Sequence, residues 1–498
     1  MPTPPNVLLL FTDMQRADTI GALGNPVIRT PHLDRLAQEG TAFTRAYAPS
    51  PVCIPARYAM HYGRYPARTG LADNKTMPPD QGDSLPSSLA ALGYDTAAIG
   101  KCHFTPDRLA MRGFGQRLVQ EECCSDPERD DYCRFLRERG SDFDEPHGTR
   151  GEMYYIPQVS LHPAAEHPTQ WVGDRTLDFL QSRQTSARPW FLFSSFIHPH
   201  PPFAPPKPWH KLYRSFDMPL PEAPTGQDAL LCWVNHHQNR YKYRDRGTDL
   251  QLLRNIKAYY YATISFVDFQ IGRIRQQLES SGQLENTLVI FASDHGEYLG
   301  DYGCFGKRGM HDASARVPLL FRWPGRFPAG QCCRQAASLV DIFPTVLAAA
   351  GGEPADRDLD GEDLSTLMAN PGRRRFVYSQ FQNGANAIHM IADDRYKYIW
   401  SCRDQREWLF DRLSDPRETA SRASLPSCRA IKDELKNHLL AYLHRHGVPG
   451  AARQNRDTLE WQKHPPADES WRLDPDAGLL TQDHEHAPPS FPPEYTTP

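Results

Sequence analysis

Short apolar runs alternate with helical patterns along roughly the first 350 residues of the chain. Asn6–Phe11, Trp190–Ile197 and Thr287–Ala292 have the continuous apolar character of central strands in a parallel sheet. Leu252–Leu278 has the spacing of a long amphipathic helix. Further strands are expected at Tyr94–Ile99 and Val317–Phe321, and further helices at Pro31 to Gly40, Ser84 to Gly93, Thr169–Leu180 and from Asp341. This alternation predicts an α/β domain with a large, mostly parallel sheet sandwiched by helices.

The pattern changes after about Gly352. Ala387–Ile391 and Tyr396–Trp400 form a predicted antiparallel hairpin, Glu407–Phe410 adds a strand, and Ile431–Leu443 is a predicted helix. We therefore expect an α/β domain over residues 1–352, a smaller subdomain with an antiparallel sheet and a helix over 353–447, and a Pro-rich tail over 448–498. The tail is expected to be ordered in part, or to pack Trp461 and Trp471 on a second subunit in a homo-oligomer.

Composition and charge exclude several classes of protein. The 498 residues are 39 % hydrophobic, so the chain lies outside the composition range of disordered proteins. A net charge of -4 provides no basic field for nucleic acid, and no apolar run is as long as a membrane helix, which needs about 20 residues. The eleven cysteines are odd in number and irregularly spaced, which predicts mostly reduced thiols and a cytoplasmic protein. Together with the charge and the short apolar runs, this predicts a protein without nucleic-acid or membrane partners.

Polar residues follow three of the predicted strands. Asp13 follows the first strand, His198 and His200 follow Trp190–Ile197, and Asp294-His295 follows Thr287–Ala292. Ligands of open α/β sheets bind at the carboxyl ends of the strands. Carboxylate and imidazole groups that meet there are suitable ligands for one divalent cation, although any one of these residues alone is as easily a strand terminator or a helix cap.

Pro51–Met60 is the most informative stretch of the sequence. Pro55 is a residue type that opens helices, and the amides and dipole of such a helix start would favour an anion near Cys53. Arg57 adds a fixed, positively charged fork to the same place. The residues by themselves predict an anion site that contains a thiol, with a buried free cysteine beside a helix start as the structural alternative.

Several segments resemble one known family. Cys53-Ile-Pro-Ala-Arg57 is similar to the C-x-P-x-R motif of type I sulfatases, in which the cysteine is oxidised after translation to formylglycine, and Gly93 to His103 is similar to the family's G-Y-x-T-x-x-x-G-K-x-H motif. Other segments follow in the family's order: Asn6 to Asp18, Thr30 to Gly40, Pro199 to Pro201, Ser293 to Glu297, Arg316 to Pro318 and Tyr396 to Tyr398. The resemblance spans roughly residues 5–445 and implies an alkaline phosphatase-like fold and hydrolysis of organic sulfate monoesters to an alcohol and inorganic sulfate.

The resemblance also implies roles for individual residues. The hydrated aldehyde at Cys53 would attack sulfur, and Arg57 would orient it. Asp13, Asp294 and His295 would bind a metal together with one oxygen of residue 53, and Lys101 and Lys307 would neutralise the sulfate oxygens. His103 would take a proton from the second hydroxyl so that sulfate is eliminated, and His200, in preference to His198, would protonate the leaving alcohol. Asn74 is a further substrate-binding candidate, and a formylglycine-generating enzyme is the implied maturation partner.

The chain departs from the family pattern at three positions. Met14 stands where the family usually has a second acidic metal ligand, and a thioether is a poor ligand for a hard cation. His295 stands where many relatives have Asn, which makes manganese or zinc an alternative to calcium. Ala56 stands where Ser is common, but Cys53, Pro55 and Arg57 are kept, so conversion of the cysteine is still expected.

Two other functions stay open at this point. Phosphonate monoester and phosphodiester hydrolases of the same superfamily share a related formylglycine apparatus, but Lys101 and His103 suit a terminal sulfate, and the phosphonate hydrolases carry uncharged residues there. The chain is also compatible with a catalytically inactive binding homologue that keeps an unmodified Cys53. The region Glu121–His162 is expected to supply substrate-selecting loops, without indicating which alcohol is esterified. The Gly-rich loop from Gly303 to Gly309 is either a mobile lid that lines the pocket or a solvated turn.

Overall fold

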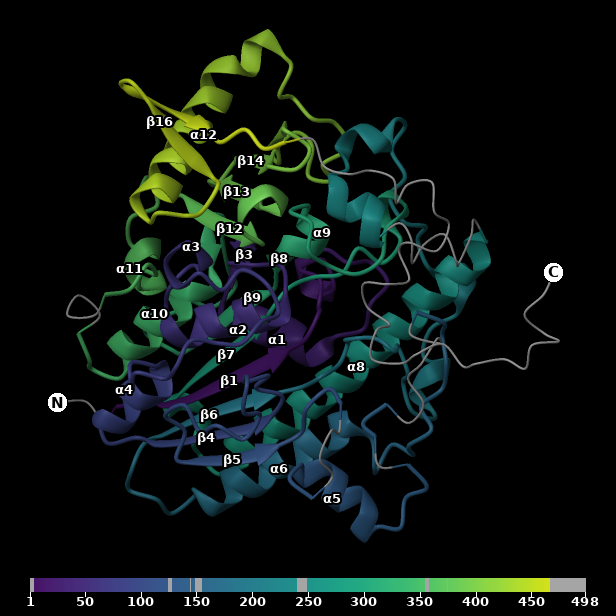
Figure 1. Cartoon of the computed structure of the whole chain (residues 1–498). Coiled ribbons are helices and arrows are strands. Elements are labelled where there is room, and N and C mark those ends of the chain that lie inside the picture. Colours follow the sequence, from purple (N-terminus) through teal and green to yellow (C-terminus); the bar gives the residue numbers. More distant parts are fainter. Residues whose placement is uncertain are drawn as a thin grey trace.

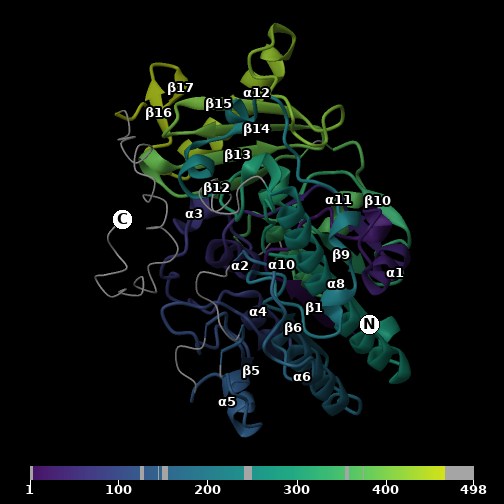
Figure 2. The ribbon, with the colours of Figure 1, turned by 90° about the vertical axis from the view of Figure 1, so that its right-hand side faces the viewer.

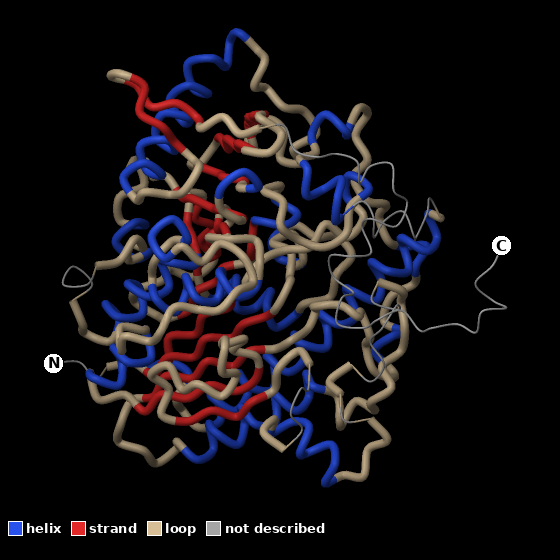
Figure 3. Tube along the Cα trace, in the orientation of Figure 1, coloured by secondary structure: helices blue, strands red, loops and turns tan. Residues whose placement is uncertain are grey.

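The computed structural model describes residues 4–123, 128–143, 145–147, 155–239, 249–353, 358–373 and 375–465. Within these residues an eight-stranded sheet forms the centre of the molecule, with helices on both sides (Figures 1 and 3). The strand order is β10-β2-β9-β7-β1-β6-β4-β5. The bounds are β1 (Asn6–Thr12), β2 (Thr41–Phe43), β4 (Asp95–Gly100), β5 (Gln116–Val119), β6 (Trp190–Ser195), β7 (Thr287–Ser293), β9 (Leu319–Arg322) and β10 (Gln331–Cys333). Only the pairings of β9 with β2 and β7 are antiparallel, which confirms the prediction of a mostly parallel sheet.

Strand β1 connects the two helical layers of the core. Val7, Leu9 and Phe11 pack in one apolar cluster, and Leu8 and Leu10 pack in another, because successive side chains of a strand point to opposite faces. The first cluster includes residues of α2 (Cys53–Tyr62), α4 (Leu85–Ala91) and α10 (Ile342–Ala349). The second includes residues of α1 (Pro31–Glu39), α6 (Pro168–Ser182) and α8 (Leu250–Ser280). This burial on both sides explains the continuous apolar run in the sequence.

The order of the strands determines where the candidate residues meet. Strand β1 lies between β7 and β6, and β6 lies beside β4, all in parallel register. The segments that follow β1, β7, β6 and β4 therefore leave the sheet at the same edge. Those segments contain Asp13, Asp294, His200 and Lys101, respectively.

A second, antiparallel sheet contains β12 (Val377–Phe381), β13 (Ile388–Ala392), β14 (Tyr396–Ser401) and β15 (Arg406–Asp411) in sequence order. Figure 2 shows it above the main sheet, near α12 (Arg429–Arg445). The smaller antiparallel sheet and its helix were predicted, but β12 was not, because its alternation is short and contains two polar residues.

The structure corrects two expectations about the elements. The strand expected at Val317–Phe321 is divided into β8 (Arg316–Val317), which joins β3 (Ala46–Tyr47) and β11 (Ala337–Ser338), and β9 in the main sheet. The start of the tail is ordered, in line with the expectation of partial order, because β16 (Ala452–Asn455) and β17 (Thr458–Trp461) form a hairpin. Trp461 stacks on Trp400 of the same chain, with ring centroids 4.9 Å apart, so it is not a free surface anchor, whereas Trp471 lies outside the described residues.

The remaining short helices are α3 (Pro66–Thr69), α5 (Asp131–Glu138), α9 (Asp312–Ala315) and α11 (Leu364–Met368). Across the described ranges, no helix combines the length and the apolar character that a membrane span requires. In the part of the chain that the structure describes, nine cysteines are free thiols, as expected for most of them, and Cys133 is disulfide-bonded.

Candidate active site

Four side chains meet where β1 and β7 end. Ligand atoms of Asp13, Cys53, Asp294 and His295 all lie within 4.8 Å of one another, and all four residues are buried. His295 Nε2 lies 3.8 Å from Asp13 Oδ1 and 3.6 Å from Asp294 Oδ1. The expected meeting of Asp13 with the Asp294-His295 pair therefore occurs, and it follows from the adjacency of β1 and β7.

Cys53 is the first residue of α2, so this helix starts two residues earlier than the position of Pro55 suggested. Its Sγ lies 2.8 Å from Lys307 Nζ and 3.3 Å from His295 Nε2. Burial and the nearby Asp13 raise the pKa of the Cys53 thiol, but Lys307, Lys101 and His295 outweigh them and hold this pKa well below its usual range. Residue 53 thus lies where an anion is stabilised at a helix N-terminus.

Arg57 fixes the positions of both carboxylates. It lies one turn after Cys53 and is fully buried, with Nε donating to Asp294 Oδ2 at 2.9 Å and Nη2 donating to Asp13 Oδ2 at 3.1 Å. Nη1 donates to the carbonyl oxygen of Lys101 at 2.7 Å and to Ser195 Oγ at 3.0 Å. Because the guanidinium is a rigid fork, these bonds connect the ends of four strands through one side chain.

Lys101 and Lys307 bring positive charge to the site from two directions. Lys101 follows β4 and is fully buried, with Nζ 2.7 Å from Asp13 Oδ2 and 2.9 Å from Glu122 Oε2. Lys307 is 4 % exposed, in a loop from Gly303 to Gly309 that is almost entirely buried and is not a solvated turn. One ammonium group thus contacts Cys53 Sγ, at 2.8 Å from Lys307 Nζ, and the other contacts Asp13.

The two candidate proton donors after β6 occupy different surroundings. His200 Nε2 lies 3.5 Å from Lys307 Nζ and 3.5 Å from Glu122 Oε1. His198 instead points away from this cluster, with Nδ1 3.1 Å from Thr169 Oγ1 and its ring 4.7 Å from that of His167. The structure therefore brings His200, and not His198, to Lys307.

His103, Asn74 and Met14 lie at the margin of the cluster. The His103 backbone N–H donates to the Glu121 carboxylate at 3.1 Å, and its ring Nδ1 is buried with no hydrogen-bond partner in the described ranges. Asn74 is exposed, and its Oδ1 accepts a bond from Ile54 N at 3.1 Å, next to Cys53. Met14 is buried, but only its backbone N–H takes part, donating to Asp294 Oδ1 at 3.0 Å.

The charges of the cluster fit a bound cation. Burial would raise the pKa of Asp13, but Lys101, His200 and Arg57 hold it well below its usual range. Burial and the neighbouring Asp13 raise the pKa of Asp294 to about 6. Two carboxylates, an imidazole and residue 53 converge here, and this donor set suits one divalent metal ion.

Two residues of this cluster were not singled out by sequence reasoning. Glu122 follows β5, an edge strand whose exposed, polar pattern gives little signal. Ser195 ends β6, and a polar residue at the end of an apolar run was the available clue. Both positions become recognisable only once the strand order is known.

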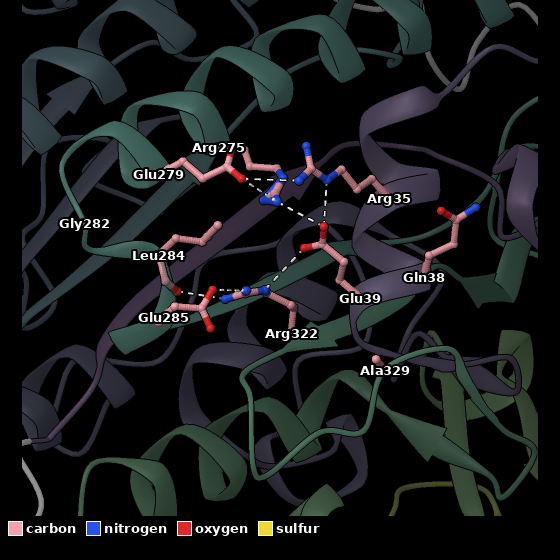
Figure 4. Close-up of a pocket in the computed structure, with 10 residues that line it drawn as sticks. All are labelled: Arg35, Gln38, Glu39, Arg275, Glu279, Gly282, Leu284, Glu285, Arg322 and Ala329. Carbon is pink, nitrogen blue, oxygen red and sulfur yellow. Dashed lines mark hydrogen bonds and ion pairs between the residues drawn. The ribbon is translucent and has the colours of Figure 1, made fainter.

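A second concave region lies at the opposite edge of the main sheet. It has a volume of about 490 Å³ and lies where α1 and α8 end and just before β7 begins. Figure 4 shows that its arginines and glutamates are paired with one another; they are Arg35, Arg275, Arg322, Glu39, Glu279 and Glu285. Their charges are mutually compensated, so this groove does not compete with the cluster around Cys53 as the reaction site.

Comparisons with known proteins identify the family. The family model "Sulfatase" matches residues 5–352, which include every residue of the cluster. The chain belongs to the sulfatase family. The model "N-sulphoglucosamine sulphohydrolase, C-terminal" matches residues 300–445 of this sulfatase.

Relatives of the sulfatase extend over most of its length. An arylsulfatase of Clostridium perfringens is 30 % identical, covering 88 % of this chain and 94 % of the relative. A choline-sulfatase of Rhizobium meliloti is 29 % identical, covering 85 % and 83 %. The solved phosphonate monoester hydrolase of Agrobacterium radiobacter superposes with a TM-score of 0.76 at 27 % identity, covering 93 % of this chain and all of that one. The chain is thus a sulfuric ester hydrolase with the alkaline phosphatase-type fold, and it cleaves sulfate monoesters.

Proposed function

We propose that this sulfatase acts through a formylglycine made from Cys53 and one divalent metal bound by Asp13, Asp294 and His295. The observation that carries the proposal is the position of Cys53, which lies at a helix start and contacts Lys307 and His295. When present, the formylglycine hydrate supplies the hydroxyl nucleophile and the metal supplies Lewis-acid activation. Calcium is the first choice for the metal, with manganese or zinc favoured by the imidazole of His295.

The side chains of the cluster have separate roles in this proposal. Arg57 holds the Asp13 and Asp294 carboxylates in the orientation that a metal needs. Lys101 and Lys307 stabilise the negative charge on the sulfate oxygens as the S–O bond breaks. His200 donates a proton to the ester oxygen that leaves with the alcohol, and His103 accepts a proton at residue 53 when sulfate is released. Asn74 supports the helix start and faces the entering substrate.

A phosphonate monoester or phosphodiester hydrolase is the second candidate, favoured by the structural likeness to the Agrobacterium radiobacter enzyme. The buried Lys101 favours the sulfatase function, because its ammonium group suits the oxygens of a terminal sulfate. The test is the ratio of kcat/KM for 4-nitrophenyl sulfate to that for a phenylphosphonate monoester, with Cys53→Ala as the inactive control. We expect the sulfate ester to be preferred, and a preference for the phosphonate ester would reverse the assignment.

Four further features belong to this proposal. The catalytic part extends over residues 1–352, followed by the C-terminal subdomain of 353–447 and the tail from 448. A formylglycine-generating enzyme acts on the chain during maturation, and the tail supports a homo-oligomer. Most cysteines of the described residues are free thiols, which suits a reducing compartment, so we place the protein in the cytoplasm; its recovery in an extracytoplasmic fraction would contradict this location.

A further inference from the structure

Glu122 connects two of the groups to which the proposed mechanism assigns substrate contacts. One carboxylate oxygen, Oε2, lies 2.9 Å from Lys101 Nζ, and the other, Oε1, lies 3.5 Å from His200 Nε2. The Glu122 side chain is 16 % exposed, and both partners are almost completely buried. Glu122 lies in the segment after β5. Its carboxylate therefore bridges Lys101, which follows β4, and His200, which follows β6.

The hydrogen bonds of His200 identify which ring nitrogen faces the substrate region. Nδ1 lies 2.8 Å from the carbonyl oxygen of Pro201, and a carbonyl can only accept a hydrogen bond, so Nδ1 carries a proton. Nε2 is then the nitrogen that gains or loses the transferable proton. This is the nitrogen that faces Glu122 and Lys307.

The charges around His200 oppose each other. Burial lowers the pKa of His200, Glu122 and Asp13 raise it, and Lys307 and Lys101 lower it, so that the pKa lies at about 3. Two ammonium groups thus disfavour the imidazolium that proton donation requires, and two carboxylates favour it. Of these carboxylates, only Glu122 lies within ion-pair distance of Nε2.

We propose that Glu122 is a positioning residue for His200: its carboxylate stabilises the protonated ring and orients Nε2 toward the ester oxygen of the substrate. This role rests on the proposed function. In the step concerned, the nucleophilic hydroxyl at residue 53 gives its proton to solvent and its oxygen bonds to sulfur as the ester S–O bond breaks, and the electron pair of that bond stays on the ester oxygen. That oxygen takes the proton from Nε2 and leaves as the alcohol, and His200 becomes neutral and is protonated again from solvent.

The role makes the effect of Glu122 depend on the leaving group. A 4-nitrophenolate carries its negative charge without a proton, whereas phenolates of higher pKa and aliphatic alkoxides need one as they leave. Glu122→Gln keeps the shape of the side chain and removes the charge. It should therefore slow the hydrolysis of esters with poor leaving groups much more than that of esters with good ones.

The experiment compares the wild-type, formylglycine-containing enzyme with Glu122→Gln, Glu122→Asp and the control Glu128→Gln. Glu128 pairs with Arg137 at the surface, where its side chain is 82 % exposed. We measure kcat/KM for 4-nitrophenyl sulfate and phenyl sulfate over pH. For Glu122→Gln we expect a loss of about 10- to 100-fold with phenyl sulfate and at most about threefold with 4-nitrophenyl sulfate. The basic limb of the profile should move down by about 1 pH unit, because the acid form loses a partner.

The outcomes separate this role from a structural one and from the proposed function. Glu122→Asp should recover part of the phenyl sulfate activity because it keeps a carboxylate, and Glu128→Gln should match the wild type. Equal losses with both esters and an unmoved pH profile would overturn the role of Glu122, even if the wild type is an active sulfatase. A wild type that hydrolyses neither ester would overturn the proposed function and this role with it.

Discussion

Lys307 Nζ lies 2.8 Å from Cys53 Sγ, although 254 positions of the chain separate the two residues. The contact joins the buried loop after β7 to the first residue of α2. An ammonium group at this distance stabilises any anion formed at residue 53 or bound to it. The contact therefore couples the motif around Cys53 to the loop that contains Lys307.

Removal of the Lys307 charge should reduce catalysis. We expect Lys307→Ala to lower kcat/KM for a sulfate ester by about 10²- to 10³-fold, because one preorganised partner of the developing charge is lost. Steady-state kinetics at saturating metal measures the effect. Lys211→Ala, which alters an exposed lysine, serves as the control. If Lys307→Ala reacts as fast as the wild type, Lys307 has no part in the reaction.

Metal content should depend on Asp294. We expect about one divalent ion per chain in the purified enzyme and much less in Asp294→Asn, since the substitution removes one of two buried carboxylates. Elemental analysis gives the stoichiometry, with Asp178→Asn at the surface as the matched control. Metal at about 100 times its Kd adds about 2.7 kcal/mol of stability, so chelation should lower Tm. Equal metal content in both variants would place the ion elsewhere.

His61 should make stability fall in acid. It is 1 % exposed on α2, with its ring 5.0 Å from that of Phe193, and burial and Arg57 lower its pKa to about 3. In the unfolded chain His61 takes up a proton near pH 6.5, whereas in the folded chain it stays neutral until about pH 3. The stability present above pH 6.5 is therefore lost as pH falls toward 3.

His61→Phe should remove this part of the pH dependence. From pH 7 to pH 5 a single such histidine costs about 2 kcal/mol, so the free energy of unfolding of His61→Phe should fall by that much less over the interval. Denaturant unfolding at each pH checks it, with the exposed His444→Phe as the comparison. Parallel curves for wild type and His61→Phe would show that His61 binds its proton equally well in the folded and unfolded states.

Trp461 should stabilise the folded state through contacts within its own chain. Its ring stacks on Trp400, and its Nε1 donates to Tyr398 Oη at 3.1 Å. We expect Trp461→Ala to cost about 3–5 kcal/mol of stability without changing the native mass, because a large buried ring is removed. Calorimetry and native mass spectrometry measure the two effects. A lower oligomeric mass with unchanged stability would instead indicate an intersubunit role.

Much of the fold follows from local pattern. β1, β6 and β7 are continuous apolar runs because each is buried on both faces, and their polar ends give Asp13, His200 and Asp294 directly. β12 and the β16–β17 hairpin lack a strong apolar period, so only tertiary packing stabilises them as strands.

The site could be predicted only in part, because some of its contacts depend on tertiary packing and not on local pattern. Cys53 and Arg57 are four positions apart on one helix, so their proximity is local and readable from the sequence. Glu122 and Ser195 reach Lys101 and Arg57 only because β5, β4 and β6 are neighbours in the sheet. Such contacts depend on strand order, which periodicity does not encode.

The chemical identity of residue 53 is the central claim. Peptide mass spectrometry across Pro51–Arg57, on protein co-produced with a formylglycine-generating enzyme, measures it directly, because conversion of a thiol to an aldehyde lowers the peptide mass by about 18 Da. We predict that the peptide about 18 Da lighter is the main species; the hydrate of the aldehyde has nearly the mass of the cysteine peptide and is not counted as conversion. If only the intact cysteine is found, the nucleophile is not formylglycine and the chain is better explained as a binding homologue that keeps the sulfatase fold.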